Sequence, residues 1–457
     1  MGAYDLVIRG GTLVTASGGV RSADVAIADG RIVAIAPELN GSVQAVIDAH
    51  NLHILPGVID AHVHFNEPGR TTWEGFASGS KALAAGGTTA FFDMPLNAHP
   101  PTLDADSFNE KLTAAKTSSY VDFGLWGGLV PANLAQLDDL AACGVVGFKA
   151  FMSSSGIEDF QAADDATLYL GMQQAARLGK LVAVHAENDQ LTAGLARQAR
   201  AQGQVGVRDY LASRPALAEL EAIERAILFA KETGCALHIV HVSTGRGVRL
   251  VASARTRGVD VSCETCPHYL VLTEEDMEEL GVVAKCAPPL RPLAEQAALW
   301  QHLFSGTLPM IASDHSPAPF EMKERADFFE AWGGISGCQS LLALLLTEGY
   351  NQRHLPLELI VAATSEFVAR RFNLPAQKGR LEVGCDADLT LVDVTCSYRL
   401  ESHHLFYRHP YSPYLGRTLR GRIVRTLVRG QTVFLDGKIV SPPIGQLVKP
   451  LSLNPGS

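Results

Sequence analysis

Six side chains that can bind divalent metal ions stand at the ends of predicted strands. The first two are His62 and His64, near the end of the apolar run from Gly57 to Phe65, which reads GVIDAHVHF. Residues two apart in a strand point to the same side, so both imidazoles project together in an arrangement that suits a divalent metal. For this pair alone, hydrogen-bonded core histidines are the alternative, and residues further along the chain must decide.

Four more candidates end later strand-like runs. Parallel strands of one barrel bring their carboxyl ends to a single face, which is where such enzymes place their chemistry. Six metal-compatible side chains at that level predict a metal-dependent active site rather than six unrelated structural roles. The four are Lys149 in GFKAF, His185 in VAVHAEN, His241 in HIVHVS and Asp314 in IASDHSP.

Lys149 is an unexpected neighbour for metal cations. It lies among Val146, Phe148 and Phe151, and an apolar environment lowers the pKa of a lysine. A neutral amine can add carbon dioxide and become a carbamate, whose two oxygens can bridge two metals. The carbamate, Asp314 and a bridging hydroxide then offset three of the four positive charges, and two metals sharing a hydroxide suit hydrolysis.

The elements that must position these residues alternate between strands and helices. Eight strand-like runs are separated by Ala-, Leu-, Glu- and Arg-rich stretches with helical spacing. This alternation predicts an α/β fold, a (β/α)8 TIM-type barrel, for residues 56–375. An open doubly wound sheet is the alternative, although no G-x-G-x-x-G follows the first strand. The expected strands are 58–62, 88–93, 120–128, 145–151, 181–185, 237–241, 259–263 and 310–314.

Both ends of the chain are β-rich in the same style. Residues 1–55 contain short β-branched runs with an Asp-Gly turn signal at position 29, and residues 376–457 have such a signal at position 436. The expected strand regions of the second segment are 387–394 and 422–434. This similarity predicts that 1–55 and 376–457 together form one composite β-sandwich domain.

Composition excludes several classes of protein. Of 457 residues, 47% are hydrophobic and 19% charged, and the net charge of -10 is spread along the chain, as in globular proteins with a substantial core. No basic patch indicates nucleic acid, no apolar segment is long enough to span a bilayer, and the amino terminus does not resemble a secretory signal. Eight sparse cysteines indicate a reduced, cytoplasmic protein, in which Cys263 and Cys266 are interpreted as packing rather than as a redox pair.

Together these motifs resemble the binuclear-metal amidohydrolase superfamily over nearly the whole chain. D-A-H-V-H at 60–64 and the four later ligands carry the resemblance, and D-H-S-P at 314–317 indicates the cyclic-amide branch of dihydroorotases, dihydropyrimidinases (hydantoinases) and allantoinases. It implies two divalent ions per subunit, zinc with cobalt, manganese or iron as alternatives, and an N6-carboxylated Lys149 that bridges them. One metal would be held by His62, His64 and Asp314, and the other by His185 and His241.

Within this branch, several stretches resemble the allantoinases most. Asn66 stands where dihydroorotases carry an arginine for the substrate carboxylate, and Ser154 stands where hydantoinases usually carry a tyrosine. The resemblance implies hydrolysis of allantoin to allantoate, with Asp314 as the catalytic residue that passes a proton from the hydroxide to the leaving nitrogen. Hydantoinase, dihydropyrimidinase or dihydroorotase activity remains an alternative, as does a non-catalytic hydantoinase-like assembly protein. The stretches include EPGRTTWEG from 67, DMPLNAHPPT from 93, DYLASRP from 209, CETCPHY from 263, AKCAPPLRP from 284 and AWGGISG from 331.

The remaining expectations concern substrate and assembly. Asn97, Ser316 and the backbone near Ala287 and Gly334 are candidates for contacts with the substrate ring and ureido group. The resemblance implies a small-molecule substrate and a homo-oligomer, a tetramer by analogy. Neither nucleic acid nor a membrane is expected as a partner.

Overall fold

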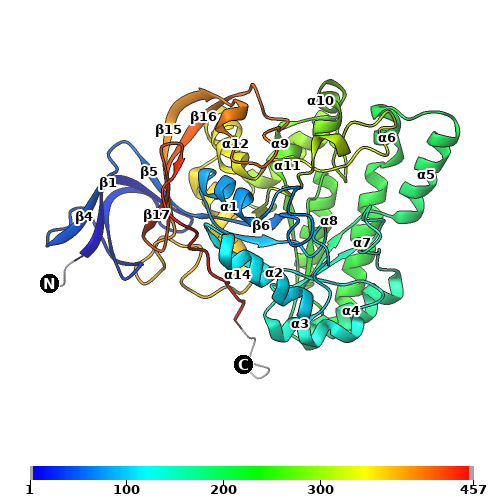
Figure 1. The fold of residues 1–457 in the computed structure, drawn as a ribbon, viewed down its shortest axis with the longest axis horizontal. Helices are drawn as coiled ribbons and strands as arrows, with labels where there is room; N and C mark the ends of the chain where they lie inside the picture. The colour runs from blue at the N-terminus through cyan, green and yellow to red at the C-terminus, as the bar shows by residue number, and fades with distance from the viewer. Residues whose placement is uncertain (1–3, 452–457) are drawn as a thin grey trace.

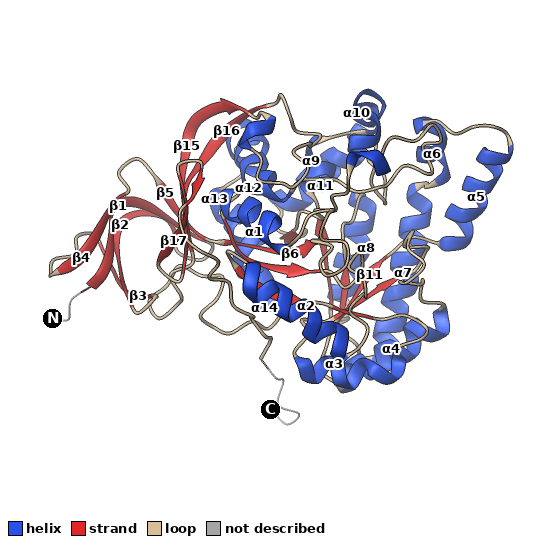
Figure 2. Cartoon of the chain, in the orientation of Figure 1, coloured by secondary structure: helices blue, strands red, loops and turns tan. Residues whose placement is uncertain are grey.

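The structure, a computed structural model, describes residues 4–451 and centres on a parallel barrel whose strands follow one another in chain order (Figures 1 and 2). The eighth strand meets the first through a parallel bridge between Val63 and His315, where the His64 nitrogen donates to the His315 carbonyl at 2.8 Å. The predicted (β/α)8 barrel is therefore confirmed, and the open doubly wound sheet is wrong. Its strands are β6 (Val58–Val63), β7 (Thr88–Asp93), β8 (Asp122–Leu125) with β9 (Gly127–Gly128), β10 (Phe148–Phe151), β11 (Val182–His185), β12 (Leu237–Ile239), β13 (Val261–Thr265) and β14 (Met310–Ile311).

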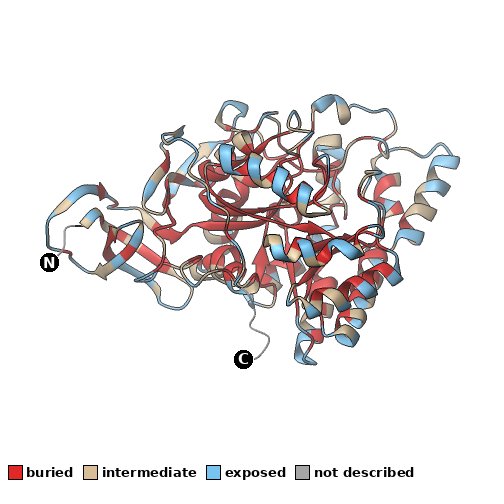
Figure 3. Ribbon diagram, turned by 60° about the horizontal axis from the view of Figure 1, so that its bottom comes forward, coloured by how far each residue is buried: buried red, intermediate tan, exposed pale blue. Residues whose placement is uncertain are grey.

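Helices surround the barrel and expose their outer faces, whereas the strands are buried (Figure 3). Side-chain caps define several helix starts, because Asp104, Asp164 and Asn188 each accept a hydrogen bond from the backbone nitrogen three residues later. The helices are α1 (Phe76–Ala85), α2 (Ala105–Ser118), α3 (Leu137–Cys143), α4 (Asp165–Arg177), α5 (Asp189–Ala201), α6 (Val207–Ser213), α7 (Ala216–Thr233), α8 (Gly245–Thr256), α9 (Pro267–Val271), α10 (Glu274–Leu280), α11 (Leu293–Phe304), α12 (Leu341–Leu344), α13 (Leu357–Val361) and α14 (Phe367–Arg371). Among the described residues, no helix has the length and hydrophobicity that crossing a membrane requires.

Strands from both chain ends form one nine-stranded sheet beside the barrel (Figure 1). The two ends meet where β5 pairs antiparallel with β15, from Leu389–Pro56 to Val392–His53. A composite β-domain made from both chain ends is thus confirmed, while the limits 1–55, 56–375 and 376–457 stay predictions. The strands are β1 (Tyr4–Thr15), β2 (Gly19–Ala28), β3 (Arg31–Ala36), β4 (Val43–Asp48), β5 (His53–Pro56), β15 (Leu389–Arg399), β16 (Thr418–Val428), β17 (Gln431–Leu435) and β18 (Lys438–Ile439).

Tight turns with positive φ connect the hairpins of this sheet. Asp29 and Gly30 have φ of 50° and 73°, and Asp436 and Gly437 have φ of 45° and 83°, the left-handed pair that favours Asp-Gly in two-residue hairpins. The run 422–434 is not one strand. Arg429, with φ of 46°, forms a third turn with the glycine that follows and divides the run between β16 and β17.

A buried ion cluster joins the sheet to the barrel. The Lys378 ammonium contacts Asp122 of β8 at 2.6 Å, Asp388 at 2.7 Å and Asp386 at 2.9 Å. Burial alone would lower the pKa of Lys378, but the three carboxylates outweigh it and raise that pKa. This cation therefore holds together two parts of the chain that are 256 residues apart.

The chain beyond β18 leaves the sheet and runs along the barrel. The Phe123 nitrogen donates to the Gln446 carbonyl at 2.9 Å, and the Val448 nitrogen donates to the Phe123 carbonyl at 2.7 Å. The end of the segment 376–457 therefore pairs with barrel strand β8, through a parallel bridge between Leu447 and Phe123, and does not join the composite sheet.

Candidate metal centre and substrate cavity

His62, His64 and Asp314 form one cluster of predicted metal ligands. The Nε2 atoms of His62 and His64 lie 3.2 and 3.4 Å from Asp314 Oδ1, and one ligand atom from each residue lies within 4.8 Å of the others. His62 is in β6 and His64 is one residue past its end, while Asp314 follows β14. Closure of the barrel therefore brings together three side chains that could hold one ion.

His185 and His241 form a second cluster beside the first. His185 ends β11, and its Nδ1 lies 3.0 Å from Nε2 of His241, which follows β12. The rings of His62 and His241 have centroids 5.5 Å apart, so the clusters adjoin. Burial lowers the pKa of all three imidazoles, and neutral imidazoles can offer a lone pair to a metal.

Lys149 lies in β10, fully buried beneath these histidines. Its Nζ has no hydrogen-bond partner among the described residues and lies 5.0 Å from the centre of the Phe151 ring. Burial lowers the pKa of this amine to about 7, although Asp314 and Glu264 act in the opposite direction. A buried ammonium without an acceptor is costly, so the side chain is suited to a neutral amine or to a modified form.

The six predicted ligands suit two divalent ions better than an internal hydrogen-bond network. Neutral imidazoles, one carboxylate and an amine without a partner converge from five different strand ends. A network of hydrogen bonds would have given the Lys149 amine an acceptor, because buried polar groups are almost always paired. The donor set, imidazole nitrogen with carboxylate oxygen, is one that zinc favours.

Sequence reasoning missed two buried carboxylates that hold histidines of the candidate ligand set. Glu264 Oε1 lies 2.6 Å from His62 Nδ1, and its Oε2 lies 3.0 Å from His238 Nε2. Glu187 Oε2 lies 2.8 Å from His185 Nε2. When a histidine donates its other ring N–H to a carboxylate, its tautomer and orientation are fixed for metal binding.

The two carboxylates differ in electrostatic environment. Burial raises the pKa of Glu264 to about 8, with the Lys149 amine acting against it. Burial would also raise the pKa of Glu187, but Arg214 and His185 outweigh it and lower that pKa to about 2. Glu187 is therefore an anion at neutral pH.

Cys266 and His268 also lie near Asp314 and offer ligand atoms within 4.8 Å of one another and of its carboxylate. Both ring nitrogens of His268 are buried and have no partner among the described residues. Cys266 and Cys263 are both buried free thiols, like most of the eight cysteines, none of which forms a disulfide.

Strained backbone accompanies the candidate ligands. His241 and Asp314 have φ of 40° and 47°, and Asn66 and Asn97 have φ of 63° and 67°. Non-glycine residues in this region cost about 1–3 kcal/mol each and persist where the surroundings over-determine them. Four of the ten such residues within residues 4–451 lie at this site, and the other six lie elsewhere in the fold.

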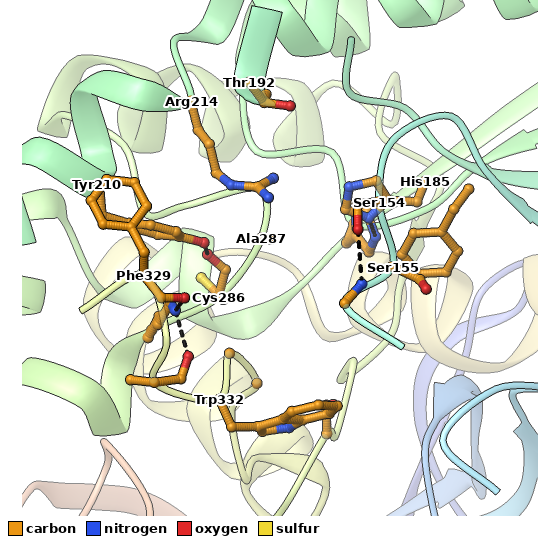
Figure 4. A pocket seen from close by; sticks show the side chains of 18 of the residues that line it. Ser154, Ser155, His185, Thr192, Tyr210, Arg214, Cys286, Ala287, Phe329 and Trp332 are labelled. Carbon is orange, nitrogen blue, oxygen red and sulfur yellow. Dashed lines mark hydrogen bonds between the residues drawn. The ribbon is translucent and has the colours of Figure 1, made fainter. Parts of the chain in front are cut away.

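A cavity of about 350 Å³ opens above the candidate ligands (Figure 4). His62, His64, His185, His241 and Asp314 contribute to its floor, whereas the fully buried Lys149 does not reach it. All four predicted substrate contacts line this cavity: Asn97, Ser316, Ala287 and Gly334. Ser154 lines it as well.

The predicted substrate contacts differ in whether their polar groups already form hydrogen bonds within the protein. Asn97 Nδ2 lies 3.3 Å from His64 Nδ1. The Gly334 nitrogen already donates to the Lys285 carbonyl, and its carbonyl accepts from Lys323 Nζ, both at 2.8 Å. The Ala287 backbone, by contrast, makes no hydrogen bond with another described residue. Ala287 is thus better placed than Gly334 to offer a backbone group to a ligand.

Two buried lysines fix the cavity wall formed by residues 329–334. Lys285 Nζ donates to the Phe329 and Ala331 carbonyls, the first at 3.1 Å, and Lys323 Nζ donates to the Trp332 carbonyl at 3.2 Å. Burial lowers the pKa of each lysine to about 7. No sequence pattern marked them, because their partners are carbonyls of an irregular loop.

Comparison with known proteins places this site in a family. The model of the amidohydrolase family matches residues 53–433. The chain therefore belongs to the amidohydrolase family. It is 61% identical to an allantoinase of Rubrobacter xylanophilus, covering 98% of both chains, and 56% identical to an allantoinase of Solibacter usitatus, covering 98% of this chain and 97% of the relative. The predicted resemblance to allantoinases is confirmed.

Solved structures agree on the fold. The L-hydantoinase (dihydropyrimidinase) from Arthrobacter aurescens superposes with a TM-score of 0.95 at 36% identity, covering 98% of this chain and 100% of that one. The dihydropyrimidinase from Brevibacillus agri gives a TM-score of 0.92 at 34% identity and covers 98% of each chain. The hydantoinase-like architecture is thus shared, while the sequence similarity to the allantoinases is greater.

Proposed function

We propose that the protein is an allantoinase, which hydrolyses the cyclic amide of allantoin and releases allantoate in purine catabolism. The observation that carries the proposal is the complete set of six candidate ligands beneath a cavity, in a chain 61% identical to an allantoinase. Water adds to the ring carbonyl, the bond from that carbon to the ring nitrogen breaks, and the products are a carboxylate and a second ureido group.

His62, His64 and Asp314 would hold one divalent ion, and His185 and His241 would hold the other. Lys149 would bridge them as N6-carboxylysine, formed when its neutral amine adds carbon dioxide and loses a proton. Two observations support this modification: Nζ has no hydrogen-bond partner within residues 4–451, and the pKa of Lys149 is lowered to about 7. Zinc is the ion we propose, because imidazole and carboxylate are its usual nitrogen and oxygen ligands.

The bound ions would supply a Lewis acid for the ring carbonyl and a water activated as a nucleophile near neutral pH. The protein groups position the reactants and move the proton. Asp314, whose carboxylate faces both the histidines and the cavity, takes the proton of the attacking water and delivers it to the leaving ring nitrogen. Glu264 and Glu187 keep His62 and His185 in the tautomers that direct a free nitrogen inward.

The substrate ring is placed by groups on the cavity wall. Asn97, Ser316 and the Ala287 backbone have polar atoms available for the ring carbonyls and N–H groups, and all three line the cavity. Gly334 contributes mainly shape, because both of its backbone polar groups are already hydrogen-bonded.

The experiment that tests the function combines metal analysis with product formation. The purified protein is assayed with allantoin, hydantoin, dihydrouracil and dihydroorotate, and its bound metal is counted by mass spectrometry. We expect close to two metal ions per chain and the highest kcat/KM for allantoin. Preference for another of the four compounds would keep the chemistry and reject the substrate. A folded, metal-free and inert chain would instead favour the non-catalytic assembly protein.

A cytoplasmic location and a homotetramer also belong to this proposal. The location is inferred from the sparse cysteines, and the tetramer is inferred by analogy with the family. Light scattering of the purified protein measures the subunit number directly.

A further inference from the structure

One wall of the cavity carries two charged side chains that the proposed mechanism does not use. Arg214 follows α6 and Asp189 begins α5, and both line the cavity. In Figure 4 the guanidinium of Arg214 extends from this wall toward the middle of the cavity, on the side of His185. A charged group at this position is within reach of a ligand in the cavity.

Arg214 is held rigidly but keeps free donors. Its Nη1 donates to Glu187, and its guanidinium carbon lies 5.7 Å from the centre of the Tyr210 ring. The side chain is 19% exposed, and neither Nε nor Nη2 donates to an acceptor within residues 4–451. Anchoring on one edge leaves the other edge of the planar guanidinium available to a ligand.

Asp189 supplies acceptors beside these donors. Its Oδ1 accepts a hydrogen bond from the Ser154 nitrogen at 2.9 Å, while its Oδ2 has no partner in the described chain. Asp189 is the first residue of α5 and Arg214 follows α6, two helices that pack against each other, and both residues line the same cavity. The wall thus presents N–H donors of a guanidinium and an acceptor oxygen of a carboxylate to the same cavity.

We propose that Arg214 and Asp189 form a subsite for a carbamoyl group, here the exocyclic ureido group of allantoin. This inference rests on the proposed function and names what distinguishes its substrate. Arg214 donates to the ureido carbonyl oxygen, and Asp189 accepts from the terminal amide nitrogen. The two contacts orient the ring so that its amide carbonyl lies above the candidate metal ligands.

Charge and desolvation select this ligand class over others. A carboxylate substituent would be repelled by Asp189, and an ammonium would be repelled by Arg214. An alkyl or aryl substituent would bury both charged groups without hydrogen bonds, which costs binding free energy. A carbamoyl group is neutral and planar, with one strong acceptor and several N–H donors, so it satisfies both side chains.

The test compares a substrate that has the ureido group with a ring that lacks it. Allantoin kinetics, the inhibition constant of unsubstituted hydantoin and the bound zinc are measured for the metal-loaded wild type, Arg214→Gln and Asp189→Ala. Asp189 is exposed, so its variant tests the subsite without disturbing the buried Glu187–Arg214 pair. Arg208→Gln on the outer side of α6, where Arg208 pairs with Glu278, is the matched control.

Loss of a charge-assisted hydrogen bond corresponds to about a thirtyfold loss in kcat/KM for allantoin in Arg214→Gln, and we expect about tenfold in Asp189→Ala. The allantoin KM should rise, while the inhibition constant of hydantoin and the zinc content of Asp189→Ala stay unchanged. Equal losses for allantoin and hydantoin, or an unchanged allantoin KM in both variants, would overturn the subsite alone. A wild type that binds hydantoin but does not open allantoin would overturn the proposed function.

Discussion

The Glu264→Gln substitution tests whether the buried carboxylate that contacts His62 sets the affinity of the site for metal. Glu264 contacts His62 Nδ1 at 2.6 Å and His238 Nε2 at 3.0 Å, and all three side chains are at most 1% exposed. Glutamine preserves shape and can still accept from His62. His238 can change tautomer to accept from the new amide, because its Nδ1 lies 2.7 Å from Ser262 Oγ. The fold should therefore survive.

At a pH above about 8, where Glu264 is ionised, the substitution removes the charge of the acceptor, so the comparison is made at pH 9. Hydrogen bonds to charged groups contribute about 1.5–3 kcal/mol against about 0.5–1.5 for neutral pairs, so the change removes roughly 1.4 kcal/mol. That difference is about tenfold in zinc affinity, at the lower end of the 10–100-fold range of such outer carboxylates. We expect the zinc dissociation constant to rise about tenfold, with activity restored at saturating zinc.

The assay is competition for zinc with a chromophoric chelator, together with metal counting after dialysis. Glu219→Gln is the matched control, because Glu219 is equally buried but accepts from Ser243 and Thr244 instead of a metal-facing histidine. An unchanged zinc affinity in Glu264→Gln, or an equal loss in Glu219→Gln, would refute the role of Glu264 in orienting His62.

Three further predictions follow from the buried charges. Lys149→Ala should abolish allantoate formation, and a short carboxylic acid added to the assay should restore part of it; unchanged activity would eliminate the carbamate bridge. Lys378→Met should destabilise the protein by about 3–5 kcal/mol in urea unfolding, because three carboxylates lose their buried partner, and a loss below 1 kcal/mol would contradict this. The pKa of Glu187 is lowered to about 2 in the folded protein. Its ionised form therefore contributes roughly 3 kcal/mol to the free energy of unfolding above pH 4.5, and this contribution is lost as the pH falls toward 2. Glu187→Gln should therefore show a shallower loss of stability over that range in thermal unfolding, and an unchanged acid profile would argue against the ion pair.

The sequence alone determined the barrel and the six candidate ligands for a local reason. Strand periodicity of two and the convergence of parallel strand ends are properties of short segments, so His62, His64, His185 and Asp314 could be placed without knowing the packing. Even the composite β-domain followed from local patterns, because Asp-Gly turns and β-branched runs mark hairpins wherever they occur.

Only the tertiary structure determined which groups support that site. Glu264 lies inside β13, which extends to Thr265, whereas the apolar run predicted an end at 263 and left the carboxylate outside the strand. Its partner His62 is 202 residues away, and no local signal encodes a contact made by closing a barrel. The same holds for Arg214, whose direction into the cavity depends on Glu187 and Tyr210. Local chemistry can be read from residue type and spacing, but the pairing of buried charges depends on how distant segments pack.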